Sequence, residues 1–277
     1  MTPPEPNLAT IRREIDSIDD SIHDLIMRRT GLVERIRAAK TGDGFYRPAR
    51  EAEIVRRLMA RHSGSFPKIS LARMWREMMA AITRLQGPFS VAAFVPDDRP
   101  GYWDLARGHF GVTVEIAAHQ TKRSVMSAVR ERMATVGLLP VPEEGEADPW
   151  WPDLGGTTNP LFIVGKLPFV PSGARGDPHA LVVGRMAQEK SGDDHSFLLI
   201  ETTQEVSRAR LTEALRKCKL PVIAFTGRAS PPQFLAEIDD FVPAADPRLA
   251  ALARAAGVTA TPVGGFATPL AAAKLRR

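Results

Sequence analysis

The feature that most restricts the fold is one helical pattern that runs from Asn7 to about Lys40. Apolar residues recur there at steps of three and four, the period of one helix face; they are Leu8, Ile11, Ile15, Ile18, Ile22, Leu25, Ile26, Leu32, Val33 and Ile36. Asn7 is a favoured N-cap residue, and the glycines within residues 41–44 break the pattern. The sequence therefore predicts a long amphipathic helix.

Three basic residues on this helix impose a second constraint. Arg29 and Lys40 are eleven residues apart, about three turns, so they project from nearly the same face and can converge on one anion. Arg12 precedes Arg29 by seventeen residues, roughly 25 Å along the axis, and lies well around the helix from it. Arg12 cannot serve the same small site from its own chain. If it serves such a site, a second copy must present it, which predicts a dimer with shared sites.

Two shorter helices complete an all-α, three-helix domain over residues 1–88. The first is expected over 48–61, with Pro48 in its first turn. Residues 62–65 form a turn, and the next helix is expected over 70–85, ending before Gly87-Pro88.

The rest of the chain predicts two further domains. In residues 89–190 we expect strands at 90–95, 112–118, 137–141, 161–170 and 179–187, a short helix between the first two strands, a helix at 122–134, and a loop at 142–160. Residues 191–277 follow the order β-α-β-β-α-β, at 196–202, 207–219, 222–226, 234–242, 247–256 and 258–263. That order is typical of a ferredoxin-like α+β unit, so the chain is multidomain.

Composition narrows the functional class. A chain of 277 residues suits two or three compact units, and a net charge of +5 without basic runs beside aromatics argues against nucleic-acid binding. Cys218 is the only cysteine, which precludes an intrachain disulfide and favours a reducing compartment. Neither a metal-ligand cluster, a signal peptide nor an apolar run of the ~18 residues of a membrane span is present. We expect a cytoplasmic protein without metal.

Residues 8–86 resemble the all-helical class of chorismate mutase. The resemblance is carried by IRREIDSID at 11–19, by Arg28-Arg29 with Lys40, by RPARE at 47–51, and by WREMM at 75–79 followed by Gln86. It implies an intertwined homodimer that rearranges chorismate to prephenate in aromatic amino-acid biosynthesis.

The resemblance also implies roles for six residues. Arg12 of a second copy and Arg29 would pair with the two carboxylates of chorismate, because a guanidinium binds a carboxylate through two hydrogen bonds. Lys40 and Gln86 would hydrogen-bond the ether oxygen of the breaking bond. Glu51 would accept a hydrogen bond from the ring hydroxyl, and Arg50 would help to shape the site. The rearrangement needs orientation and stabilisation of negative charge, and neither nucleophile nor cofactor.

Three positions depart from the family pattern. Ile54, Val55 and Ile82 stand where relatives carry an arginine, an acid and a serine. These are secondary contacts, so we expect weaker substrate binding rather than loss of the chemistry.

Residues 89–190 resemble part of a prephenate dehydratase, beginning with VAAFVP at 91–96. The family's glycine-rich substrate loop is replaced by PDDRPG at 96–101, and Pro178-His179-Ala180 occupies the place of its Thr-Arg-Phe triplet. We therefore expect a degenerate segment without dehydratase activity.

Residues 191–277 resemble an ACT domain, an amino-acid-sensing unit, which implies an amino-acid effector at this C-terminal domain. Both of the family's sensor motifs are changed, to TQEVS at 203–207 and to TGRA at 226–229. We therefore do not expect phenylalanine sensing, and a dimer-stabilising module is the simpler interpretation.

Three alternatives stay open. An isochorismate pyruvate lyase shares the helical fold and much of the cationic site, and is distinguished by salicylate production. A bifunctional mutase and dehydratase would form phenylpyruvate. A non-catalytic regulator that binds an aromatic metabolite would be stabilised by its ligand without turnover.

Overall fold

Three helices open the computed structural model, which describes residues 7–39, 45–98, 100–171, 178–202, 206–229 and 231–275. They are α1 (Leu8–Ala39), α2 (Pro48–Arg61) and α3 (Lys68–Gln86). These bounds confirm the three predicted helices to within two residues at each end. The side-chain oxygen of Asn7 accepts a hydrogen bond from the Ala9 amide at 3.1 Å, so Asn7 caps α1 as predicted. Lys40 lies outside the described residues.

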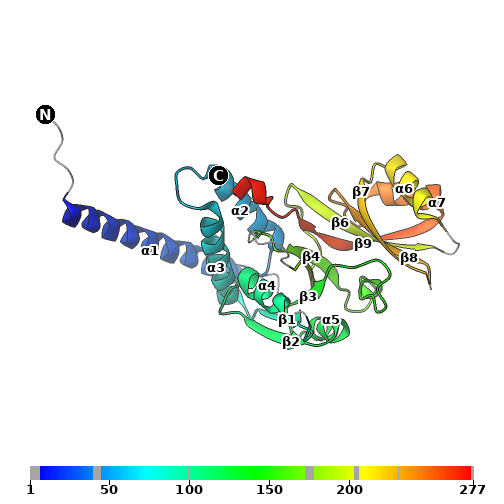
Figure 1. The fold of residues 1–277 in the computed structure, drawn as a ribbon, viewed down its shortest axis with the longest axis horizontal. Helices are drawn as coiled ribbons and strands as arrows, with labels where there is room; N and C mark the ends of the chain where they lie inside the picture. The colour runs from blue at the N-terminus through cyan, green and yellow to red at the C-terminus, as the bar shows by residue number, and fades with distance from the viewer. Residues whose placement is uncertain are drawn as a thin grey trace.

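Helix α1 extends away from the rest of the molecule (Figure 1). Its C-terminal end contacts α3, where the Arg37 side chain donates to the Leu85 carbonyl oxygen at 2.9 Å. The large apolar residues farther along α1 are exposed; Ile15 and Leu25, for example, are 51% and 62% accessible. An amphipathic helix normally buries its apolar face. One copy of this chain leaves that face of α1 uncovered.

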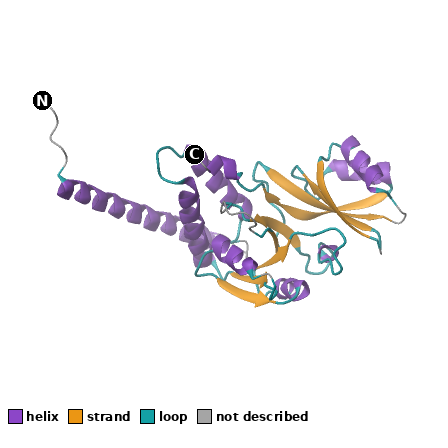
Figure 2. Ribbon diagram, viewed as in Figure 1, coloured by secondary structure: helices purple, strands orange, loops and turns teal. Residues whose placement is uncertain are grey.

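The described strands form one sheet in the order β2-β1-β3-β5-β4-β9-β6-β8-β7. Their bounds are β1 (Ser90–Phe94), β2 (Glu115–His119), β3 (Val136–Pro140), β4 (Phe162–Leu167), β5 (Ala180–Gly184), β6 (Asp194–Thr202), β7 (Val222–Arg228), β8 (Gln233–Ile238) and β9 (Val258–Ala267). Figure 2 shows the sheet lying between helices at both ends of the molecule.

Two helices cover opposite faces of the first part of the sheet. They are α4 (Gly101–Phe110) and α5 (Lys122–Arg130). Val91 and Ala93 of β1 share a core with Phe110 of α4, whereas Ala92 between them shares a core with Val125 of α5. This alternation follows from the two-residue period of a strand. Strand β1 is therefore buried on both faces, which explains its unbroken apolar sequence.

The C-terminal part has the predicted β-α-β-β-α-β order. Helices α6 (Arg208–Lys217) and α7 (Pro247–Ala256) pack on one face of the antiparallel strands β9-β6-β8-β7. This strand order is that of the ferredoxin-like unit. Asp246 caps α7 by accepting a hydrogen bond from the Arg248 amide at 2.9 Å.

The sheet continues across residue 190, where the sequence placed a domain boundary. β4 pairs with β9 at Ile163 and Gly264. Gly264 has a φ of 99°, and a Cβ there would lie 2.1 Å from the Ile163 carbonyl oxygen, so only glycine permits this approach. A core that contains Trp150 and Trp151 also reaches Phe197 and Phe266 of the tail. The boundaries at 88 and 190 stay predictions.

Several predicted bounds were wrong. The strand expected at 112–118 begins at Glu115, because Gly111 has a φ of 94° and Val112 is exposed. The helix expected at 122–134 ends at Arg130, because Arg132 adopts a left-handed φ of 63°. In both cases a residue with positive φ lies near the end of the element, whereas the apolar pattern of the sequence extends beyond that end. Within the described residues, no helix is both long and apolar enough to cross a membrane.

Candidate active site

The candidate site lies at the junction of the three N-terminal helices. Arg29 comes from α1 and Glu51 from α2, and the two charges are close enough to shift each other's pKa. Gln86 is the last residue of α3, and its side-chain amide donates to the Ile82 carbonyl oxygen at 3.4 Å. The contact between Arg37 and Leu85 holds this end of α3 against α1.

Arg29 is partly buried and its charge is incompletely compensated. Among the described residues, its Nη1 atom is buried without a hydrogen-bond partner. Burial lowers the pKa of Arg29, and the attraction of Glu51 opposes that change. A guanidinium stays protonated under all ordinary conditions. Arg29 is therefore a cation with unsatisfied hydrogen-bonding capacity, as expected for a residue that binds an anion.

Glu51 is held by a residue that sequence reasoning did not assign. Arg76 of α3 donates from Nη1 to the Glu51 carboxylate at 2.9 Å, and the two side chains are only 7% and 12% exposed. Burial raises the pKa of Glu51, and the opposing effects come from Arg76, then Thr83, then Arg29. Arg76 has Ala72 and Met79 on the same helix face, and both are buried. An arginine on an otherwise apolar helix face was the sequence feature that could have indicated a role for Arg76.

Arg76 also joins the helical part to the α/β part. Its Nη2 atom lies 2.5 Å from Nε2 of His109 in α4 and donates to the His109 carbonyl oxygen at 3.2 Å. Burial, and then the charge of Arg76, hold the pKa of His109 well below its usual value. His109 is therefore neutral, and its Nε2 accepts the hydrogen bond from Arg76. One buried guanidinium thus links α2, α3 and α4.

Two of the remaining predicted residues, Arg12 and Arg50, are not part of this cluster in one chain. Arg12 lies on the exposed part of α1, roughly 25 Å along the axis from Arg29. Arg50 is exposed and forms an ion pair with Glu53 at 2.7 Å. Lys40 falls outside the described residues, so its position is not part of this geometry.

Two of the positions that depart from the family pattern belong to an apolar core. Val55 is fully buried, and Ile54 packs beside it against a cluster that includes Phe169. Ile82 is also buried, at 6% exposure. The side chains that replace polar family residues therefore contribute to packing between the helices and the rest of the molecule.

The cluster can bind an anion, and among the described residues no group of three His, Cys, Asp or Glu side chains could hold a metal ion. Arg29 supplies a cation with an unsatisfied donor, and Glu51 supplies a buried acceptor held in place by Arg76. This arrangement suits a small ligand that carries both a carboxylate and a hydroxyl group.

Comparison with known proteins gives a family match for the helical part. Residues 11–87 match the family model of chorismate mutase type II. The chain is 29% identical over 151 residues to a bifunctional chorismate mutase/prephenate dehydratase of Pseudomonas aeruginosa, a match that covers 51% of this chain and 40% of the relative. It is 30% identical over 148 residues to the enzyme of that name in Stutzerimonas stutzeri, covering 50% and 40%. The chain thus spans about two fifths of the length of the curated relatives it matches.

Two solved structures are similar in fold at low identity. A prephenate dehydratase from Streptococcus mutans superposes with a TM-score of 0.47 and 12% identity, over 65% of this chain and 98% of that one. A prephenate dehydratase from Arthrobacter aurescens in complex with L-Phe gives a TM-score of 0.47 and 11% identity, over 66% and 92%.

Proposed function

We propose that this chain is a chorismate mutase, an intramolecular isomerase that rearranges chorismate to prephenate. The observation that carries this proposal is a pair of residues in the stretch matched by the chorismate mutase type II family, residues 11–87. The buried Nη1 atom of Arg29 has no hydrogen-bond partner among the described residues, and Arg29 lies beside the buried carboxylate of Glu51. Both residues were assigned to the site from the sequence.

The proposed mechanism relies on orientation and charge. Arg29 and Arg12 of a second copy bind the two carboxylates and hold the enolpyruvyl arm over the ring, which converts a rare conformer into the bound one. Lys40 and Gln86 stabilise the negative charge that develops on the ether oxygen. Glu51 accepts from the ring hydroxyl, and Arg50 helps to shape the entrance.

The mechanism requires a homodimer, which we also propose. The exposed apolar face of α1 supports it, since residues such as Ile15 and Leu25 lose contact with water when a second helix covers them. A second copy lying along α1 would bring its own Arg12 towards the Arg29 end. The dimer then contains two sites, each made from both chains.

For the remainder of the chain we propose a degenerate dehydratase-like segment over 89–190 and an ACT-like module over 191–277. In the place of the family's triplet, Ala180 is the fully buried first residue of β5 and His179 before it is exposed, so the triplet's hydroxyl and guanidinium are both missing there. In the tail, the ferredoxin-like strand order supports the ACT-like interpretation.

An amino-acid effector at this tail also stays a proposal. Of the two changed sensor motifs, residues 203–205 lie outside the described part of the chain. At the second motif, the Gly227 amide already donates to Glu144 at 3.2 Å, and Arg208 pairs with the same carboxylate. An effector carboxylate would have to displace Glu144, which supports weak sensing.

The decisive experiment follows chorismate consumption by the full chain, with prephenate and phenylpyruvate both quantified. We expect prephenate without phenylpyruvate. Salicylate from isochorismate would instead indicate the lyase, and phenylpyruvate the bifunctional enzyme. Stabilisation by chorismate with no turnover would refute the mutase and favour the non-catalytic regulator.

A further inference from the structure

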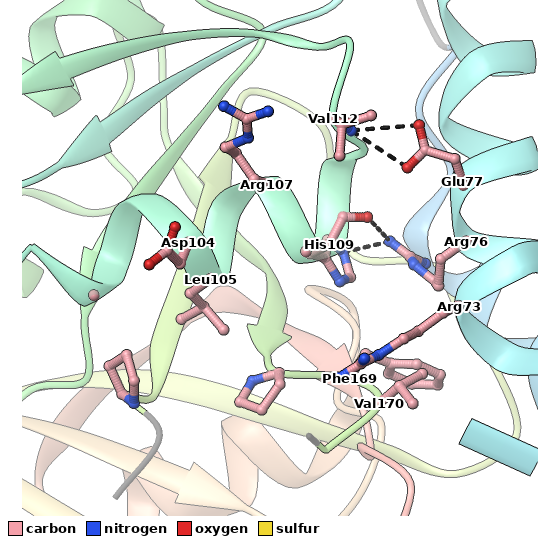
Figure 3. Close-up of a pocket in the computed structure, with 14 residues that line it drawn as sticks. Arg73, Arg76, Glu77, Asp104, Leu105, Arg107, His109, Val112, Phe169 and Val170 are labelled. Carbon is pink, nitrogen blue, oxygen red and sulfur yellow. Dashed lines mark hydrogen bonds between the residues drawn. The ribbon is translucent and has the colours of Figure 1, made fainter. Parts of the chain in front are cut away.

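A cavity lies beside the candidate active site, between α3 and α4. Its volume is about 560 Å³, within the ~300–1,000 Å³ range of small-molecule sites. Figure 3 shows His109 and Leu105 of α4 on one side, Arg73 and Arg76 of α3 on the other, and Phe169 at the base. None of the six residues to which the chorismate mutase resemblance gives a role lines this cavity, whereas Gly101 and Pro178, from the dehydratase-like loop and triplet positions, do.

One wall of the cavity is apolar. It is formed by Leu105 and by the segment that follows β4, namely Pro168, Phe169 and Val170, and Pro178 also lines the cavity. Phe169 is 5% exposed and is anchored in the core that includes Val55. The wall is therefore fixed in place and can contact a flat apolar group.

The α3 side of the cavity carries two arginines. Arg73 and Arg76 are three residues apart on α3, so they share a face. Arg73 is exposed and forms no hydrogen bond or ion pair within the part of the chain that the structure describes, and the buried Nε atom of Arg76 has no partner there either. The carboxylates of Glu77 and Asp104 also line the cavity, and that of Glu77 accepts from the Val112 amide at 3.3 Å.

Arg76 is shared between this cavity and the candidate active site. Its Nη1 atom binds Glu51 and its Nη2 atom contacts His109, which leaves Nε as the remaining donor. An anion that binds Arg73 and Nε of Arg76 would attract the Arg76 guanidinium and so weaken its interaction with the Glu51 carboxylate. Occupancy of the cavity by such an anion would then change how firmly Glu51 is held.

We propose that this cavity binds an organic carboxylate with an apolar or aromatic body, through Arg73 and Arg76, and that its occupancy acts on the active site through the ion pair between Arg76 and Glu51. The second half of this proposal rests on the proposed mutase function.

Binding is tested by titration calorimetry of the full chain with 3-phenylpropanoate. Replacing Arg73 by alanine removes a charge-assisted contact, so Arg73→Ala should weaken binding about tenfold or more. The matched control is Arg84→Ala, because Arg84 is an exposed arginine of the same helix that does not line the cavity. 2-Phenylethylammonium, with the same ring and the opposite charge, should not bind. Absence of 3-phenylpropanoate binding, or equal binding by Arg73→Ala and Arg84→Ala, would overturn the proposed site.

Coupling is tested by measuring KM for chorismate with and without 3-phenylpropanoate. We expect a change of about threefold in the wild type and in Arg84→Ala that disappears in Arg73→Ala. Direct competition at the mutase site would persist in Arg73→Ala and would refute the coupling, as would an unchanged KM. If no variant turns over chorismate, the proposed function and the coupling both fail, while calorimetry still decides the binding site.

Discussion

Removing one partner of the ion pair between Arg76 and Glu51 should strongly destabilise the junction of α2 and α3. The two side chains are 7% and 12% exposed and their charged atoms are 2.9 Å apart. Arg76→Met would leave the Glu51 carboxylate buried without its main partner and would also remove both contacts to His109. Breaking a buried pair in this way typically costs about 3–5 kcal/mol. We expect a loss of that size in the free energy of unfolding.

The double variant Arg76→Met/Glu51→Gln separates the pair from the packing. With both charges removed, no uncompensated charge stays buried, so we expect the double variant to lie within about 2 kcal/mol of the wild type. A double-mutant cycle should then give an interaction energy of about 2 kcal/mol or more, since the two groups are in direct contact.

The matched control is Arg50→Met, which breaks the neighbouring pair with Glu53 on α2. Those side chains are 57% and 38% exposed, so this change should cost at most about 1 kcal/mol. Urea unfolding followed by far-ultraviolet circular dichroism measures all five proteins, namely the wild type, Arg76→Met, Glu51→Gln, the double variant and Arg50→Met. If Arg76→Met and Arg50→Met cost the same, or if the double variant is as unstable as Arg76→Met, the pair does not have the role assigned to it.

Four further predictions follow from the same geometry. Burial lowers the pKa of His109 in the folded state, so the associated stability is fully present above the unfolded-state pKa of about 6.5 and is lost as the pH falls towards the folded-state pKa. His109→Gln still offers an acceptor to Arg76 and should flatten the acid side of a plot of unfolding free energy against pH. An unchanged plot would contradict this. Lys40→Ala should lower kcat by about 10²–10³ while circular dichroism is unchanged, and near wild-type turnover would remove Lys40 from the mechanism. Arg12→Ala and Arg29→Ala should each be nearly inactive but regain activity when mixed and allowed to exchange subunits; inactive heterodimers, verified by mass, would exclude a shared site. A chain ended at Pro88 should retain turnover yet unfold at a lower temperature, because Val55 loses its contact with Phe169; a Tm equal to that of the full chain would contradict that packing.

The helices were predictable because their signals are local. In α2, the fixed φ of Pro48 favours the first turn, and the turn at residues 62–65 ends the helix, so both bounds could be read from neighbouring residues. The strand bounds were less predictable because a strand ends where its partner ends. β9 extends beyond the predicted residue 263 to Ala267 because β6 continues to pair with it through Asp194.

The candidate site, too, could be predicted only in part from local sequence. The spacing on α1 and the family resemblance identified Arg29, Lys40, Glu51 and Gln86 before any fold was known. The resemblance included Arg76, but its role depends on Glu51 and His109, which are 25 and 33 residues away in the sequence. No local pattern relates residues so far apart.

By itself, the sequence determined the three helices and the order of the tail, because each depends on residue type at short spacing, and it predicted the residues of the candidate site. Only the tertiary structure decided that one buried guanidinium joins α2, α3 and α4, that the sheet continues from β4 into β9, and that the α1 face stays exposed in one chain. The physical reason is that burial and charge pairing are set by which distant segments pack together. A side chain such as Arg76 acquires its role from that packing.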